Sequence, residues 1–336
     1  MARRALVAFV LGVAYHELGF VLAGWIFQAF AVLVGVGIIV SFLKPSLIPM
    51  SLIVCLFLVG LVRGEAGPVT IPYLAETQAY LSTTTRSFSE KIVQALPEPQ
   101  ASYLGGLLVG ARSDIPSEVR DNFRETGTSH LVALSGFNVT IIVNYLGKIF
   151  SSLWFPAFGI ILFVLATGAQ SSLVRAAIMG ILALLSSRLG HNYQAGTALL
   201  FAASIMLFFD PTLLFGDIGF QLSVAATWGL VYLAPSLTHY LRKVPNWLGF
   251  RENLALTLAA QAATFPFIFY YFGGVSYWAP LVNILVLVAV PPTMFFGFLT
   301  GMLGFVHPLV AQVVAWPTWL LLTYQLRVIE FFAARI

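Results

Sequence analysis

Charged residues are scarce in this sequence. Only 9% of its 336 residues are Asp, Glu, Lys or Arg, whereas an ordinary soluble domain has roughly 25%. Hydrophobic residues make up 59%, and apolar runs close to the roughly 20 residues that cross a bilayer recur along the chain. This composition excludes a soluble globular protein. Because the runs are continuous rather than short and alternating, it also argues against a membrane β-barrel.

The sequence also lacks the residues of several common active sites. Cys55 is the only cysteine, which excludes an intramolecular disulfide and a cysteine-based metal site. The five histidines occur singly, so no His-x-x-x-His pair offers zinc ligands. Neither a P-loop of the form Gly-x-x-x-x-Gly-Lys-Ser/Thr nor the HxHxDH signature of metallo-β-lactamase-type nucleases is present. We therefore expect no catalytic residues, no metal and no cofactor.

Charges and turn residues divide the apolar sequence into about twelve candidate spans. The predicted fold class is all-α, a polytopic transmembrane helical bundle in which some spans are broken or re-entrant. His16-Glu17 shortens the first span, and Pro291-Pro292 allows two late spans to form one kinked or re-entrant element. The spans are expected at 5–20, 22–42, 46–62, 130–149, 152–168, 171–187, 193–209, 213–233, 253–270, 276–290, 293–306 and 309–326.

Loop charges predict the orientation of these spans. Arg3 and Arg4 place the N-terminus in the cytoplasm, because cytoplasmic loops are enriched in Lys and Arg. Both termini are then expected on the cytoplasmic side of the cytoplasmic (inner) membrane. The same rule explains the net charge of +4, for which a nucleic-acid partner is the alternative. The basic residues that this scheme places inside are Lys44, Lys148, Arg188, Arg242, Lys243, Arg251, Arg327 and Arg335.

The scheme divides the chain into N-terminal transmembrane helices (1–62), a short external segment (63–129) and a second transmembrane domain (130–336). The external segment carries eight acidic and six basic residues. Ala75–Leu96 has the spacing of an amphipathic helix, which either lies at the membrane interface or packs on the external face of the bundle. A second amphipathic helix is expected to begin at Asp114-Ile115-Pro116 and to end at Gly127.

The span predicted at 130–149 opens with the polar stretch Gly-Thr-Ser-His-Leu-Val-Ala-Leu-Ser-Gly-Phe-Asn-Val-Thr at 127–140. Lipid offers no hydrogen-bond partners, so polar groups here are expected to face protein or a wet cavity. We expect Ser135-Gly136 to break the helix, leaving backbone groups and Asn138 to line an internal cavity. A helix bend with local back-bonding is the alternative. A hydrolase using Ser135 and His130 is a third interpretation, although no Gly-x-Ser-x-Gly elbow and no nearby acid supports it.

Arg175 is the residue that is most costly to leave in lipid. It lies near the external end of its span, so it either snorkels to the headgroups or faces the bundle interior, where it pairs with an acid or meets a phosphate. Asp217 is expected at a similar depth, which permits an Arg175–Asp217 ion pair. Asp217 and Gln221 are four residues apart and share one helix face, whereas Ser223 lies off it.

Later spans add single polar residues and many aromatic rings. Gln261 and Asn283 are candidates either for lining an internal path or for interhelical hydrogen bonds. Gly297 and Gly301 form a G-x-x-x-G pair that is typical of close helix packing. The chain has 29 Phe, 12 Tyr and 7 Trp. Most of these rings are expected to face lipid or fill the bundle, but some offer stacking surfaces for unpaired bases.

Three stretches together resemble the ComEC competence family, whose signature reads close to G-x-S-H-L-L-A-I-S-G-L-H-V. They are 127–140, Ser-Ser-Leu-Val-Arg-Ala-Ala-Ile-Met at 171–179, and Asp-Ile-Gly-Phe-Gln-Leu-Ser at 217–223, in family order. The resemblance runs from about Leu104 to the C-terminal region, more loosely over Gln261–Asn283. Asn138 departs from the histidine that is common in the family, which puts in doubt any role needing a titrating group there.

This resemblance implies an inner-membrane channel that passes single-stranded DNA into the cytoplasm during natural transformation. It implies as partners single-stranded DNA, membrane lipids, an external DNA receptor, a cytoplasmic ATPase or helicase, a separately encoded nuclease and further copies of the chain. A transporter of a small solute or lipid-linked molecule is the alternative. The candidate translocation-path residues are His130, Ser135, Gly136, Asn138, Arg175, Asp217, Gln221, Gln261 and Asn283.

Overall fold

A computed structural model describes residues 2–17, 60, 72–111, 114–132, 134, 136, 138–141, 152–246, 249–274 and 276–335. These residues form helices and no strand, so the predicted all-α class is confirmed for them. The elements are α1 (Ala2–Glu17), α4 (Pro72–Ala95), α5 (Gln100–Val109), α6 (Ser117–Glu125), α7 (Ser129–Val132), α9 (Trp154–Ala166), α10 (Ser171–Arg188), α11 (Ala195–Phe209), α12 (Leu213–Gly216), α13 (Ile218–Tyr232), α14 (Ala234–Tyr240), the 3-10 turn η2 (Leu241–Lys243), α15 (Phe250–Phe272), α16 (Ala279–Leu287), α17 (Val290–Gly304) and α18 (Pro308–Ala333).

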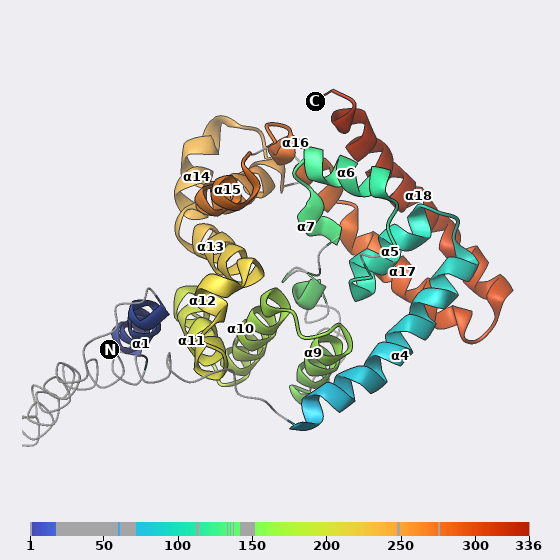
Figure 1. The fold of residues 1–336 in the computed structure, drawn as a ribbon. Helices are drawn as coiled ribbons and strands as arrows, with labels where there is room; N and C mark the ends of the chain where they lie inside the picture. Colours follow the sequence, from blue (N-terminus) through green and yellow to red (C-terminus); the bar gives the residue numbers. More distant parts are fainter. Residues whose placement is uncertain are drawn as a thin grey trace, which may run out of the picture.

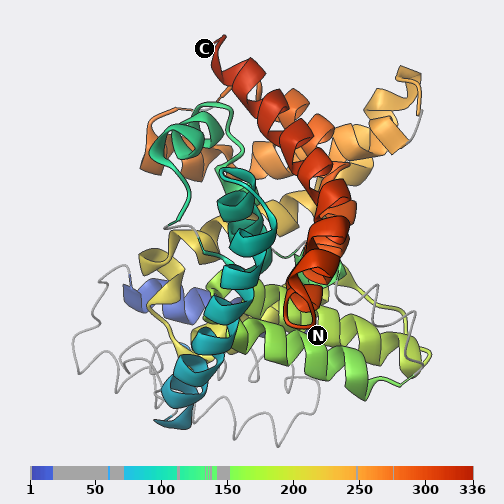
Figure 2. The ribbon, with the colours of Figure 1, turned by 90° about the vertical axis from the view of Figure 1, so that its right-hand side faces the viewer.

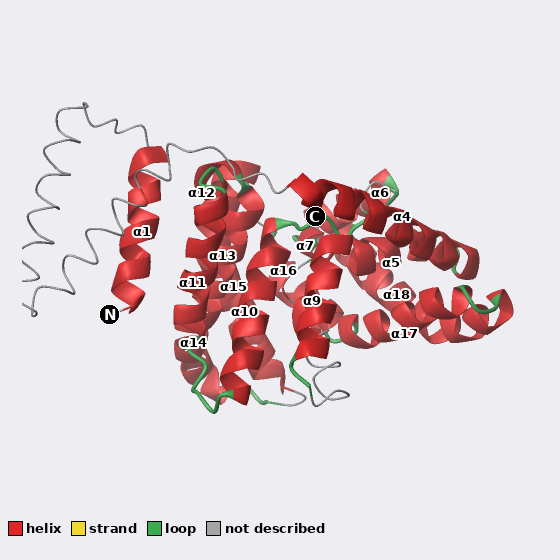
Figure 3. Cartoon of the chain, turned by 90° about the horizontal axis from the view of Figure 1, so that it is seen from below, coloured by secondary structure: helices red, strands yellow, loops and turns green. Residues whose placement is uncertain are grey.

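The helices fall into two groups (Figure 1). In one, α10 packs on α11 and α13, and α13 packs on α14 and α15. In the other, α4, α5 and α6 pack with α17 and α18. Figure 3 shows α9, α10, α11, α13 and α15 running beside one another, while α17 and α18 lie across them. Contacts of α9 with α4 and of α16 with both α15 and α18 join the two groups.

The second group has the larger apolar core. Ile92 of α4, Leu104 of α5 and Leu322 of α18 are buried in one cluster. Figure 2 shows the long helices α4 and α18 of this group running steeply, at a large angle to α9 and α10. The predicted amphipathic helix is therefore present as α4. Its Ile92 is buried in the core and its Phe88 packs against that core, whereas its Val93 is 54% exposed. Of the two alternatives, the structure favours packing on the bundle.

The G-x-x-x-G prediction is also confirmed. A Cβ atom added at Gly297 would lie 2.5 Å from the Cδ1 of Leu104, and one at Gly301 would lie 2.3 Å from the ring of Phe88. Larger residues at these positions would therefore separate α17 from α5 and α4. Each glycine serves close helix packing rather than a polar path.

Helices occur at every span that was expected from residue 152 onward. Three of them, α10, α15 and α18, are long and apolar enough to cross a membrane. The number rises to five if each of two bent pairs counts as one span. The chain is therefore a helical membrane protein, but twelve spans are not confirmed. The spans expected at 22–42 and 46–62 lie outside the described residues, apart from residue 60. The external placement of 63–129 and the cytoplasmic placement of both termini stay predictions.

The two bent pairs have similar geometry. The axes of α13 and the α14–η2 segment differ by 48°, and those of α16 and α17 differ by 49°. Proline lies at the start of both α14 and α17, where it cannot donate the N–H that would continue the preceding helix. The break expected from Pro291-Pro292 is therefore present, just before these residues.

Candidate functional site

The break in the first signature stretch lies at Leu134. The short helix α7 ends at Val132, Leu134 is not helical, and Gly136 and residues 138–141 are helical again. A helix interruption is therefore present, but it lies at Leu134 and not at Gly136, while Ser135 lies outside the described residues. Thr140 donates a hydrogen bond to the carbonyl of Gly136 at 3.0 Å, so the local back-bonding that we gave as the alternative is present as well.

Helices α5 and α10 hold this break in place. The Ser172 hydroxyl of α10 donates to the carbonyl of Leu134 at 3.1 Å. The Asn138 amide donates to the carbonyl of Leu107 in α5 at 2.9 Å, and Asn138 is only 2% exposed. Asn138 was expected to line a cavity, but its side chain is buried against the backbone of α5. Its observed contact is a structural tie.

Gly127 begins the signature stretch, and its position excludes a side chain. Its φ of +68° lies in the left-handed region, which favours glycine. A Cβ atom there would also lie 2.8 Å from the Cβ of Ala279 on α16. Helix α6 therefore ends close to Gly127, as predicted, and the chain passes against α16 on its way to α7.

His130 and Ser135 provide no catalytic geometry among the described residues. His130 lies on α7 and is exposed, while Ser135 lies outside the described residues. The hydrolase interpretation therefore stays a prediction that the contacts of the described residues do not support.

Arg175 is buried inside the protein. It is 7% exposed, so it does not snorkel away from the helices around it. Its Nε donates to the Ser223 hydroxyl at 2.6 Å, and its Nη1 contacts the Met179 sulfur at 3.2 Å. A Cβ atom added at Gly136 would lie 3.1 Å from its Nη2. We call these four residues, Gly136, Arg175, Met179 and Ser223, the Arg175 cluster.

Asp217 does not pair with Arg175. Its carboxylate accepts hydrogen bonds from the Ser171 hydroxyl and, at 2.8 Å, from the backbone N–H of Phe220. The second contact caps α13, as is common for an acid at a helix start. The ion pairs formed by described residues do not include Arg175 or Asp217. The proposed ion pair is therefore wrong, because the acid is already occupied by a hydroxyl and a helix cap.

Gln221 also serves α13 and the turn before it. Its amide donates to the carbonyl of Leu214 at 2.9 Å, and the residue is 8% exposed. Its Oε1 is buried without a hydrogen-bond partner in the described part of the chain. The hydrogen bonds of the described residues therefore do not join Gln221 to Arg175, whereas Ser223, which we had placed off the shared face, accepts one from Arg175.

The three signature stretches meet in this region. Ser172 connects the second stretch to Leu134 of the first, and Arg175 lies beside Gly136. Hydrogen bonds from Ser171 and Arg175 connect the second stretch to Asp217 and Ser223 of the third. Segments that are far apart in the sequence thus converge on one guanidinium group.

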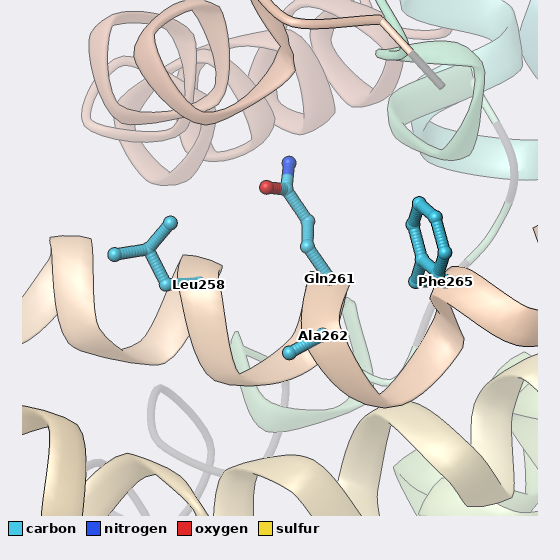
Figure 4. A pocket seen from close by; sticks show the side chains of 4 residues that line it. All are labelled: Leu258, Gln261, Ala262 and Phe265. Atoms are coloured by element: carbon cyan, nitrogen blue, oxygen red, sulfur yellow. The ribbon is translucent and has the colours of Figure 1, made fainter. Parts of the chain in front are cut away.

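Gln261 and Asn283 do not belong to the Arg175 cluster. Gln261 lies on α15 and lines an open depression of about 440 Å³ together with Leu258, Ala262 and Phe265 (Figure 4). Asn283 on α16 is 4% exposed, and its Oδ1 is buried with no hydrogen-bond partner within the described ranges. The candidate residues therefore divide between at least two places.

A second buried polar cluster was missed by the sequence analysis. The Tyr103 hydroxyl donates to the Gln325 Oε1 at 2.7 Å, and the Gln325 Nε2 donates to the Thr293 hydroxyl at 2.6 Å. All three side chains are fully buried, and they join α5, α17 and α18. We call them the Gln325 cluster. The Gln325 amide inside the apolar run of α18 was the available signal, because burying an amide without a partner is costly.

Comparisons with known proteins agree with the extent of the signature. Residues 107–335 match the family model described as Competence protein. Over 203 residues, 56% of this chain, the sequence is 30% identical to ComE operon protein 3 of Bacillus subtilis (strain 168). The chain spans 25% of the length of that relative. No solved structure matches the chain.

Proposed function

Because this chain belongs to the competence protein family, we propose that it forms the membrane path by which single-stranded DNA passes into the cytoplasm during natural transformation. Membership in the family supports a role in DNA uptake. We further propose that the Arg175 cluster contacts the phosphates of the strand on its way through the bundle. On this proposal the chain guides the strand without catalysing a reaction.

The observation that carries the proposal is a buried cation whose observed partners are neutral. The hydrogen bonds of Arg175 go to a hydroxyl and to a thioether sulfur, which is a weak acceptor. Within the described ranges no acid forms an ion pair with it. Burying an arginine in this way is costly, and a protein that retains one usually uses it.

A phosphate of the DNA strand suits this guanidinium. Arginine presents a planar fork of donors that matches phosphate oxygens in pairs. A passing strand would satisfy these donors in turn. A single cation also suits transport, because phosphate contacts dominate affinity and a continuous basic lining would hold the strand too tightly.

The proposal includes partners and an orientation. We propose that an external receptor delivers the strand, that a cytoplasmic ATPase or helicase draws it inward, and that a separate nuclease removes the complementary strand. The segment 63–129 would then face the receptor.

Single cysteines at Ser89 and Asn246, in a Cys55→Ser background, test this orientation. They should react with an impermeant thiol reagent from opposite sides of the membrane. Labelling of both from one side would refute this orientation.

Uptake of labelled DNA by a deletion strain that is complemented with variants of this chain tests the function. Arg175→Ala should lower internalised DNA by roughly tenfold or more, since a hydrogen bond to a charged group is worth about 1.5–3 kcal/mol. Arg175→Lys should restore uptake only in part, because a point charge does not reproduce the fork. Arg188→Ala, an exposed arginine at the other end of α10, is the matched control and should behave as the wild type.

Three results would contradict the proposal in whole or in part. Normal DNA uptake by the deletion strain would exclude the channel, and saturable uptake of a small solute that is lost on deletion would favour a solute transporter. Normal uptake by a stably expressed Arg175→Ala protein would leave the channel intact but remove Arg175 from its path.

A further inference from the structure

The depression on α15 places an amide beside aromatic side chains. Leu258, Gln261, Ala262 and Phe265 line it. Figure 4 shows Leu258, Gln261 and Phe265 projecting from α15 to the same side, toward helices drawn in the colours of the C-terminal part of the chain. Phe269, one turn beyond Phe265, continues this stripe. We call the five residues the α15 face.

The rings of the α15 face are arranged as an open stack. The Phe265 and Phe269 rings lie with centroids 6.0 Å apart and planes at 20°. Both side chains are more than half exposed, at 51% and 59%. A flat ligand can therefore reach the ring faces without displacing another side chain.

Polar groups of the α15 face need hydrogen-bond partners that lipid lacks. The carbonyl of Ala262 receives no helical hydrogen bond from position 266, because Pro266 has no N–H. The Gln261 amide, from the residue just before Ala262, offers two donors and an acceptor to the depression. Acyl chains satisfy none of these groups. A lipid tail alone is therefore a poor occupant.

The α15 face carries no charged side chain. The nearest charged residues in the sequence of this helix, Arg251 and Glu252, lie at its start, about 15 Å along the axis from Gln261. Neutral donors and acceptors beside stacked rings suit a nucleobase, which has a flat π-face and a neutral polar edge. They do not suit a phosphate, which the Arg175 cluster serves.

We infer that the α15 face binds the unpaired bases of the translocating strand, an inference that rests on the proposed function. Phe265 and Phe269 stack on the bases, and the Gln261 amide and the Ala262 carbonyl bind their edges. Every base has a π-face, and an amide can rotate to donate or accept, so this contact tolerates any sequence. Phosphate and base contacts are thereby assigned to two different helices.

The full chain in lipid nanodiscs provides the test, with an oligothymidylate strand and an abasic strand of equal length as probes. The wild type should bind the strand with bases roughly fivefold more tightly or better, since stacking contributes about 1–3 kcal/mol per base. Phe265→Ala should remove most of this preference and leave the affinity for the abasic strand unchanged. Gln261→Leu should reduce the preference less. Tyr270→Ala is the matched control, because Tyr270 is 81% exposed on α15 but lies off the stripe.

Equal binding of both strands by the wild type would overturn the inference, whether or not the variants fold. A Phe265→Ala protein with the base preference of Tyr270→Ala would also overturn it and would show that the rings face lipid only. Failure of the proposed function looks different. In that case the wild type binds neither strand, and the deletion strain internalises DNA normally.

Discussion

The Arg175 cluster and the Gln325 cluster are both buried groups of polar side chains between helices, yet they differ in charge and in hydrogen bonding. The Gln325 cluster is neutral, and its hydrogen bonds run from Tyr103 through Gln325 to Thr293, which donates to the carbonyl of Ala289 at 2.6 Å. In the Arg175 cluster, a positively charged guanidinium donates hydrogen bonds to a hydroxyl and to a sulfur atom. The two clusters are therefore alike in burial and differ in charge and in hydrogen-bond partners.

The helices around the two clusters differ in the same way. The Gln325 cluster lies where α5, α17 and α18 form the larger apolar core, and close glycine contacts fix these helices. The Arg175 cluster lies beside the break at Leu134, where regular backbone hydrogen bonding stops. Under the proposed function, the first site keeps the helices rigid and the second admits the strand. Changes at the two sites should therefore affect different measurements.

The largest effect is expected from Gln325→Leu, which removes the centre of the neutral cluster. Two hydrogen bonds between helices are lost, and the Tyr103 and Thr293 hydroxyls lose partners. Interhelical hydrogen bonds in membranes contribute about 0.6 kcal/mol on average and up to about 1.7 kcal/mol, so unfolding free energy should fall by roughly 1–3 kcal/mol. Thermal unfolding in nanodiscs measures this loss, and DNA uptake per folded molecule should not change. A fall in uptake with unchanged stability would erase the contrast between the clusters.

A somewhat smaller effect, on uptake rather than on stability, is expected from Gly136→Val. A Cβ atom at this position lies only 3.1 Å from the Arg175 Nη2 and 3.2 Å from the Ala176 Cβ, so a branched side chain must displace the guanidinium. Uptake should approach that of Arg175→Ala, roughly a tenfold loss. Gly216→Ala is the control, because a Cβ atom there meets nothing within 4 Å. Wild-type uptake by Gly136→Val would show that the position of Arg175 is unimportant.

Asn138→Ala should have a modest effect on stability. It removes one buried hydrogen bond to the carbonyl of Leu107, which corresponds to about 1 kcal/mol or less in unfolding free energy. Because the tie holds the break that carries Gly136, uptake should fall only as far as the folded fraction falls. A much larger loss of uptake at normal protein level would return Asn138 to the translocation path.

The smallest effect is expected on the salt dependence of strand binding. For single strands the slope of log affinity against log salt changes by about 0.7 for each phosphate contact. Strand binding by Arg175→Ala protein should therefore show a slope that is shallower by about 0.7, while Gln325→Leu protein should keep the wild-type slope. Identical slopes for Arg175→Ala and the wild type would separate Arg175 from the phosphates.

Much of the fold was accessible from the sequence, because long apolar runs in a chain with few charges permit little but helices. The helices from α9 to α18 include those expected as spans, and the bend before Pro291 follows from residues that disrupt helices. These features are local. Each depends on a few neighbouring residues, which the sequence displays directly.

The contacts of the candidate site were harder to predict, because they depend on how helices rotate about their axes. Similar depth suggested that Arg175 meets Asp217, but Ser171 and the start of α13 occupy that carboxylate. Helical spacing correctly separates Ser223 from the face of Asp217 and Gln221, yet it does not say which face turns toward α10. The Gln325 cluster was missed for the same reason, since its three residues come from three helices.

The ties at Leu134 also bear on how the protein is made. The carbonyl of Leu107 precedes Asn138 in the chain, so it is ready when the break emerges from the ribosome. Ser172, which binds the carbonyl of Leu134, is synthesised later. Until α10 has been synthesised, the Leu134 carbonyl lacks this hydrogen-bond donor, and lipid does not supply one. The segment around Leu134 is therefore expected to remain with the insertion machinery until α10 is complete, so that this segment and α10 enter the bilayer together.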